Sequence, residues 1–116
     1  MSEPTLPELL GIERKGPLQA ELRLRLPEAL LYFRGHFPGG AILPAVVQID
    51  WAIHYAVELF GLDGTFRGMD RLKFRRVLEP LEEPRLVLEH DPTDGVLEFS
   101  YSTAAGRHSS GQLWLR

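Results

Sequence analysis

The segment Tyr32–Ala56, YFRGHFPGGAILPAVVQIDWAIHYA, decides the fold, because a turn rich in glycine and proline runs directly into a long apolar stretch. Pro44 suits the first position of a helix and Gly61 suits its end, so the sequence predicts one helix over residues 43–60. At 1.5 Å per residue this helix would be about 25 Å long. Apolar residues occur nearly all the way round it, which predicts that other structure encloses it.

Sequence on both sides of this helix has the pattern of β-strands. Residues 18–26, LQAELRLRL, alternate strictly between apolar and polar side chains, as a half-buried strand does. Residues 4–15 are predicted to form a short helix that ends at Gly11 or Gly16. Four further strands are predicted at RGMDRLKFRRVLEP (67–80), PRLVLEH (84–90), VLEFSYST (96–103) and SGQLWLR (110–116).

The turns between the last four strands are short and polar, and strands joined in this way are mostly antiparallel. The sequence therefore predicts an α+β fold in which an antiparallel sheet curls around one central helix, with residues 1–116 as a single domain. His90 and His108 are predicted to be solvated, because each adjoins a polar turn.

The composition is that of an ordinary globular protein, with 44% hydrophobic and 25% charged residues. A net charge of −3 gives no general attraction for nucleic acid, and the chain has no cysteine for disulfides or thiolate chemistry. Glu3 and Glu8 stand where an export signal needs a basic start. Gln48, Asp50 and His54 interrupt the apolar segment, which argues against a membrane span. We expect a protein of the reducing cytoplasm.

Asp50 is the unusual residue of the predicted helix, since a carboxylate is costly to bury as a charge. Either it lies on a solvated stripe with His54 and Glu58, which follow at intervals of four, or it has a chemical task. A metal site from His36, Asp50 and His54 is conceivable, but helical spacing alone is a weak sign. We expect no metal and no cofactor. His36, taken by itself, is typical of a turn residue bonded to the backbone.

The strings GHFPGGAILPAVVQIDWA and MDRLKFRRVLEP resemble motifs of the hotdog-fold 3-hydroxyacyl-[acyl-carrier-protein] dehydratases. That family has G-H-F-x-G, a spacer, P-G-V and an acidic helix residue, followed later by K-F-R-x-x-V-x-P. LPAVVQIDWA is most similar to the dehydratases associated with aryl polyene gene clusters. Ala45 stands where the family usually has glycine, and EPLEE replaces its usual P-G-D. The resemblance implies a hotdog fold.

The resemblance also implies roles for individual residues in dehydrating a 3-hydroxyacyl thioester. His36 would be the base at C2, and Asp50 would be the acid for the departing 3-hydroxyl. Backbone N–H groups near Gly39 and Ala45 would stabilise the enolate-like oxygen. Burial among apolar neighbours would favour the protonated form of Asp50. Two aromatic residues would contact the substrate: Phe37 and Trp51. Core packing is the other interpretation of Trp51.

The implied partners are an acyl carrier protein, or another acyl-pantetheine thioester, and a second copy of the chain. In the family, the histidine of one subunit meets the acidic residue of the other in a homodimer, which can assemble further. A basic cluster is either a solvated strand face or a docking surface for an acidic carrier: Arg71, Lys73, Arg75 and Arg76.

Two other functions stay open for this sequence. One is a hotdog thioesterase, in which the helix carboxylate activates water, although the histidine of GHFPG argues against it. The other is a non-catalytic acyl-binding subunit, which Ala45 keeps open because it departs from the family pattern.

Overall fold

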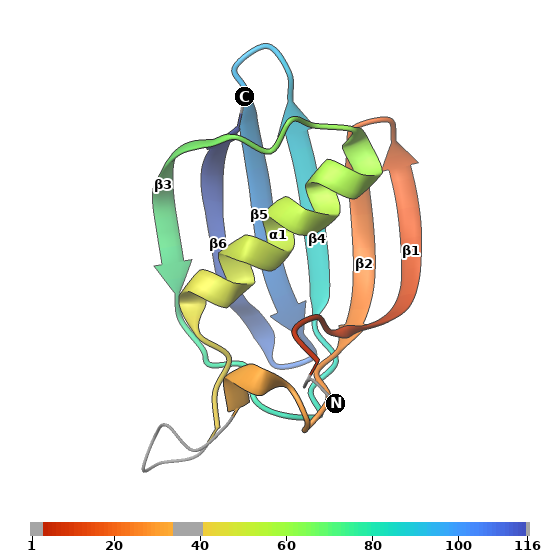
Figure 1. Cartoon of the computed structure of the whole chain (residues 1–116), viewed down its shortest axis with the longest axis vertical. Coiled ribbons are helices and arrows are strands. Elements are labelled where there is room, and N and C mark those ends of the chain that lie inside the picture. Colours follow the sequence, from red (N-terminus) through yellow and green to blue (C-terminus); the bar gives the residue numbers. More distant parts are fainter. Residues whose placement is uncertain (1–3, 34–40, 116) are drawn as a thin grey trace.

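A single antiparallel sheet forms the frame of the protein (Figure 1). The structure is a computed structural model, and it describes residues 4–33 and 41–115. Within these residues the sheet has six strands in the order β1-β2-β4-β5-β6-β3, so β1 and β3 are its edges. The strands are β1 (Glu8–Gly16), β2 (Gln19–Arg25), β3 (Phe66–Phe74), β4 (Arg85–Asp91), β5 (Val96–Thr103) and β6 (Gly106–Leu115).

One helix, α1 (Ala45–Phe60), lies across one face of this sheet, with its start near the end of β3 and its end near β1 and β2 (Figure 1). The predicted helix is confirmed, but Pro44 is its N-cap and not its first helical residue. Gly61 ends the helix in the left-handed conformation, with φ 68°, and its N–H donates to the Val57 carbonyl at 3.0 Å. A short 3₁₀ helix, η1 (Leu31–Phe33), lies where the sequence predicts a turn or short strand.

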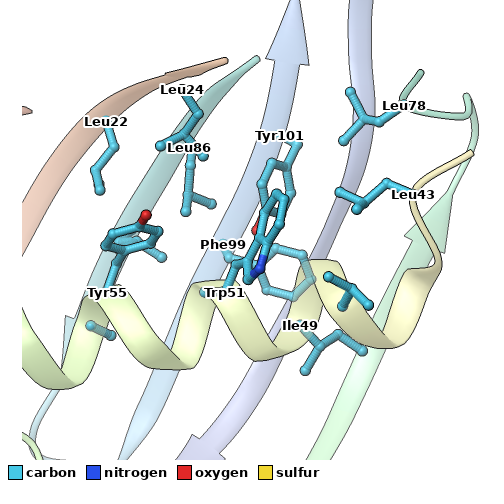
Figure 2. Close-up of a cluster of buried hydrophobic side chains, with 14 of the residues drawn as sticks. Leu22, Leu24, Leu43, Ile49, Trp51, Tyr55, Leu78, Leu86, Phe99 and Tyr101 are labelled. Atoms are coloured by element: carbon cyan, nitrogen blue, oxygen red, sulfur yellow. The ribbon is translucent and has the colours of Figure 1, made fainter. Parts of the chain in front are cut away.

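The hydrophobic core lies between α1 and the sheet (Figure 2). The strict alternation of residues 18–26 is confirmed, because Ala20, Leu22 and Leu24 of β2 are all fully buried. From the helix, Trp51 and Tyr55 extend into the same core. This arrangement of one helix on an antiparallel sheet is the α+β hotdog fold that the resemblance implied. In the described part of the chain, no helix is long and apolar enough to cross a membrane.

The predicted helix over residues 4–15 is wrong, since residues 8–16 form strand β1 and pair with β2. Pro17 and Leu18 make a two-residue turn that brings the two strands together, and tertiary pairing overrides the local helix propensity. Irregular register at Leu9/Gly11 and Arg14/Gly16 bends the strand and obscures its alternation in the sequence.

The prediction that structure encloses α1 on every side is also wrong for the single chain. One side of the helix packs on the sheet, whereas Asp50 and Glu58 on the other side are exposed. Val46 there is 63% exposed despite its apolar side chain. The apolar residues that go round the helix therefore mark a surface that residues 4–33 and 41–115 leave uncovered.

His108 is buried, with 1% of its surface exposed, so its predicted position in a solvated turn is wrong. Strand β6 begins at Gly106, and only Ala104 and Ala105 form the turn. The imidazole Nδ1 lies 2.9 Å from the Val77 carbonyl, which can only accept, so Nδ1 carries a proton. Nε2 lies 2.8 Å from the Thr103 hydroxyl, which donates to it when the ring is neutral. His108 thus fastens the segment after β3 to the sheet.

His90 adjoins a turn as predicted, at the end of strand β4, but it is partly buried and so not fully solvated. Its Nδ1 is buried and has no hydrogen-bond partner among the described residues. This burial lowers the pKa of His90 below the ordinary value, against a smaller opposing effect of Asp91.

We predict that His108→Ala lowers the free energy of unfolding by about 2–4 kcal/mol, because it opens a cavity and leaves the Val77 carbonyl without its donor. Thr103→Val removes the partner of Nε2, together with the acceptor of the exposed Ala105 N–H, and should lower the free energy of unfolding by about 1 kcal/mol. Urea unfolding followed by circular dichroism measures both changes. A His108→Ala protein as stable as the wild type would contradict this role.

Candidate active site

The first turn of α1 offers backbone donors, as the sequence predicted for Ala45. Ala45 is the first helical residue and is exposed. The helix has no side-chain cap and no acidic residue in its first turn, so its leading N–H groups are free of these competitors. Those groups and the helix dipole favour a partial negative charge at this end. The Ala45 side chain is exposed, so the described residues do not crowd the methyl group that stands where the family usually has glycine.

A small cavity of about 230 Å³ lies beside this helix end. The start of α1 forms one wall, and the segment that follows β3 forms the other. Its lining residues are Ile42, Leu43, Pro44, Ala45, Gln48, Phe74, Arg75, Arg76 and Val77. Backbone N–H donors, apolar side chains and the guanidinium groups of Arg75 and Arg76 therefore surround the same cavity.

Asp50 lies on the outer side of α1, where its carboxylate is exposed. The prediction that Asp50 is buried among its apolar sequence neighbours is therefore wrong for the single chain. Val47, Ile49 and Trp51 face the sheet and are buried, whereas position 50 is turned to the opposite side by the helical period. Apolar surroundings for this carboxylate would have to come from outside the described residues.

The stripe predicted for Asp50, His54 and Glu58 does exist on the outer side of the helix. His54 and Glu58 continue it toward the C-terminal end and lie 3.6 Å apart as a partly exposed pair. Such a pair contributes little to stability. Within the residues that the structure describes, no group of His, Asp and Glu has the arrangement of a metal site.

Three of the predicted site residues, His36, Phe37 and Gly39, lie outside the described residues, so their roles stay predictions. Trp51 lies in the core with 2% of its surface exposed, and its indole N–H donates to the Thr5 carbonyl at 3.0 Å. This position agrees with the core interpretation of Trp51 and gives no support to a substrate contact.

Gln48 belongs to this site and was missed by the sequence reasoning. Its side chain is 3% exposed, on the side of α1 that faces the sheet. The carboxamide donates to the Leu43 carbonyl at 3.2 Å and accepts from the Ser109 hydroxyl at 2.7 Å. The Gln48 main-chain carbonyl accepts from the Tyr101 hydroxyl at 2.6 Å. The sequence did contain a signal for Gln48: a polar residue that stands three positions before Trp51 and therefore on the same face of the helix.

The basic cluster is divided between two places. Arg71, Lys73 and Arg75 line a cavity of about 510 Å³ on the outer face of the sheet, and Arg107 of β6 joins them. Arg76 instead lines the small cavity at the start of α1, which Arg75 also reaches. Within the described residues, none of these cations forms an ion pair with an acidic side chain.

Arg71 reaches the outer face through a β-bulge. Asp70 pairs with Gln112 and Lys73 with Ser110, so Arg71 and Leu72 together oppose a single residue of β6. Arg71 has φ 54°, a left-handed conformation that is strained for a residue with a side chain. The bulge places Leu72 over Gly111, where an added Cβ would overlap it, and leaves Arg71 beside Lys73.

Comparison with known proteins identifies relatives over nearly the whole chain. Residues 13–112 match the family model described as "ApeI-like: ApeI dehydratase". The solved dehydratase heterocomplex ApeI:P from Xenorhabdus doucetiae contains a chain with a TM-score of 0.87 and 33% identity, covering 95% of this chain and 97% of that one. An uncharacterised protein from Erwinia carotovora subsp. atroseptica gives a TM-score of 0.85 and 35% identity, covering 96% of each chain.

Curated relatives carry the name 3-hydroxyacyl-[acyl-carrier-protein] dehydratase FabZ. The protein of Alkaliphilus metalliredigens is 37% identical over 65 residues, which are 50% of this chain and 44% of the relative. The protein of Novosphingobium aromaticivorans is 34% identical over 85 residues, which are 62% of this chain and 54% of the relative. The chain thus spans about half the length of the curated relatives that it matches. With the match over residues 13–112, the chain belongs to the ApeI-like dehydratase family.

Proposed function

We propose that this protein removes water from 3-hydroxyacyl thioesters carried by an acyl carrier protein and forms trans-2-enoyl thioesters. The observation that carries the proposal is the uncapped start of α1 at Ala45, beside a small cavity and followed on the same helix by Asp50. Family membership and the GHFPG motif with His36 support the same reaction. Fatty acid or aryl polyene biosynthesis is the proposed context, and the cytoplasm is the proposed location.

In the proposed reaction, His36 takes the proton from C2, and the electron pair moves toward the thioester carbonyl. The developing negative charge on that oxygen is stabilised by backbone N–H groups at Gly39 and Ala45. Asp50 gives a proton to the 3-hydroxyl as the C3–O bond breaks, so water leaves and the C2–C3 double bond forms. Return of the proton from His36 to Asp50 then restores the starting state.

A second protein chain completes the site in this proposal, because Asp50 is exposed in the single chain. The outer side of α1 carries the apolar Val46, and the edge strand β3 presents Met69, which is 50% exposed. A second chain that pairs along β3 would cover both and would shield Asp50 from water. We propose a homodimer. The ApeI:P heterocomplex suggests a different chain of the same family as the alternative partner.

The carrier protein docks, in this proposal, on the basic outer face of the sheet. Four cations, Arg71, Lys73, Arg75 and Arg107, line this face together with two carboxylates, Glu89 and Glu98, so the local charge is positive in a chain whose net charge is −3 and favours an acidic partner. Arg75 also lines the cavity at the start of α1, and therefore connects the docking surface with the proposed thioester site.

We predict that the purified protein converts 3-hydroxyacyl carrier protein to the enoyl product, measured by mass spectrometry. His36→Ala and Asp50→Asn should each lower kcat at least about 100-fold, because each removes a proton-transfer group. His54→Ala is the matched control from the same stripe of α1 and should leave kcat within about twofold. Release of free thiol would instead favour a thioesterase, and binding without turnover would favour the acyl-binding subunit.

Mixed dimers test whether the site is shared between two chains. We predict that His36→Ala and Asp50→Asn proteins, inactive alone, recover about a quarter of wild-type activity when unfolded and refolded together in equal amounts. Half of the dimers are then mixed, and each has one site with both groups intact. Mixtures as inactive as their components would contradict a homodimeric shared site. A wild-type chain that is active only with a second family member would favour the heterocomplex.

Charge reversal tests the docking surface. We predict that Lys73→Glu combined with Arg107→Glu raises KM for the acyl carrier protein about tenfold, because an attraction becomes a repulsion. KM for the corresponding acyl-pantetheine should not change, since it lacks the carrier. Lys15→Glu on the far edge strand β1 is the control for charge alone. An equal rise of KM for both substrates would place the carrier elsewhere.

A further inference from the structure

The side chain of Gln48 connects the sheet with the segment 41–44 in front of α1. A buried amide is costly unless its donor and acceptor both find partners. Both do here, because Nε2 donates to the Leu43 carbonyl and Oε1 accepts from the Ser109 hydroxyl of β6. These groups are all buried, so water cannot replace either bond.

Leu43 is held from both sides by these contacts. Its N–H donates to the Leu78 carbonyl at 2.8 Å, and its carbonyl accepts from Gln48. Pro44 follows with its φ fixed by the ring, and the first helical N–H comes directly after it. These two bonds therefore fix the residue that stands two positions before the first helical N–H.

The opposite wall of the small cavity is anchored on the neighbouring residue of β6. The main-chain carbonyl of His108 accepts from the N–H groups of Arg75 and Arg76, at 2.9 Å and 3.2 Å. Its imidazole holds the Val77 carbonyl. His108 and Ser109 thus support the two walls from adjacent positions of a single strand, which sets the separation of the walls.

We propose that Gln48 is a positioning residue of the dehydratase site. The Ser109 hydroxyl fixes the Gln48 carboxamide by a hydrogen bond, and the carboxamide in turn holds the Leu43 carbonyl. The first N–H groups of α1 thereby stay directed at the thioester oxygen. This inference rests on the proposed function. Attachment of the helix itself does not need the carboxamide, because Tyr101 bonds the main-chain carbonyl of Gln48 and the apolar face of α1 is buried. If Gln48 served stability alone, loss of the Tyr101 hydrogen bond should affect activity as much as loss of the carboxamide bonds.

Three variants separate positioning from stability. Gln48→Leu removes both carboxamide bonds, and Ser109→Ala removes only the hydrogen bond from the Ser109 hydroxyl, with a smaller effect on folding. Tyr101→Phe is the matched control, since it removes one buried hydrogen bond from the same residue but leaves the carboxamide intact. Unfolding in urea measures stability, and steady-state kinetics with 3-hydroxyacyl carrier protein give kcat and KM.

Hydrogen exchange of the Leu43 amide, followed by NMR, reports the turn without any need for activity. We expect exchange at Leu43 to be about tenfold faster in Gln48→Leu, and kcat to be about tenfold lower with KM within about twofold. Ser109→Ala should also speed the exchange at Leu43 and lower kcat, each by a smaller factor than Gln48→Leu. Tyr101→Phe should be less stable than the wild type, yet keep its kcat and its Leu43 protection.

The inference is overturned if Ser109→Ala and Gln48→Leu keep wild-type kcat and Leu43 protection, or if Tyr101→Phe loses kcat to the same extent as Gln48→Leu. An inactive wild-type protein would remove the proposed function. The exchange of the Leu43 amide would then decide alone whether Gln48 holds the turn, so the two failures are distinguishable.

Discussion

Burial of one side of α1 against the sheet is the constraint on which the rest of the structure depends. Because a helix turns by about 100° per residue, this packing assigns every position of the segment to an inner or an outer side. Gln48 and Trp51 are directed to the sheet, and Asp50 is directed away from it. An exposed carboxylate and a buried carboxamide two residues apart thus belong to different surfaces: Asp50 faces away from the sheet, and Gln48 bonds the Leu43 main chain and the Ser109 hydroxyl.

Strand alternation and helix length were predictable because they are local. The five predicted strands and the helix that ends at Gly61 were found, although the strand predicted at 67–80 ends at Phe74 and the one predicted at 110–116 already begins at Gly106. Strand β1 was not predictable, since its irregular pairing with β2 hides the period of two. His108 was mistaken for a turn residue because its partners at Val77 and Thr103 come together only through the strand order. Long-range pairing accounts for both errors.

The site was predictable to a similar degree. Ala45 lies at the helix start as the motif indicated, and Asp50 lies on the predicted stripe. The environment of Asp50 was not predictable, because apolar neighbours in sequence lie on other sides of a helix. The contribution of Ser109 was invisible for another reason: a serine in a strand gives no sign that a helix glutamine sixty-one positions earlier needs its hydroxyl.

The bulge at Arg71 has a consequence for the assembly of chains. An exposed edge strand can accept any extended segment, which leads to uncontrolled growth of sheets. In β3 the extra residue shifts the backbone between Asp70 and Lys73, so the hydrogen-bonding groups before and after it are out of step. A regular strand aligned with one half cannot match the other. The bulge at Arg71 therefore disfavours pairing of this edge with a regular strand and favours a partner strand with a matching irregularity.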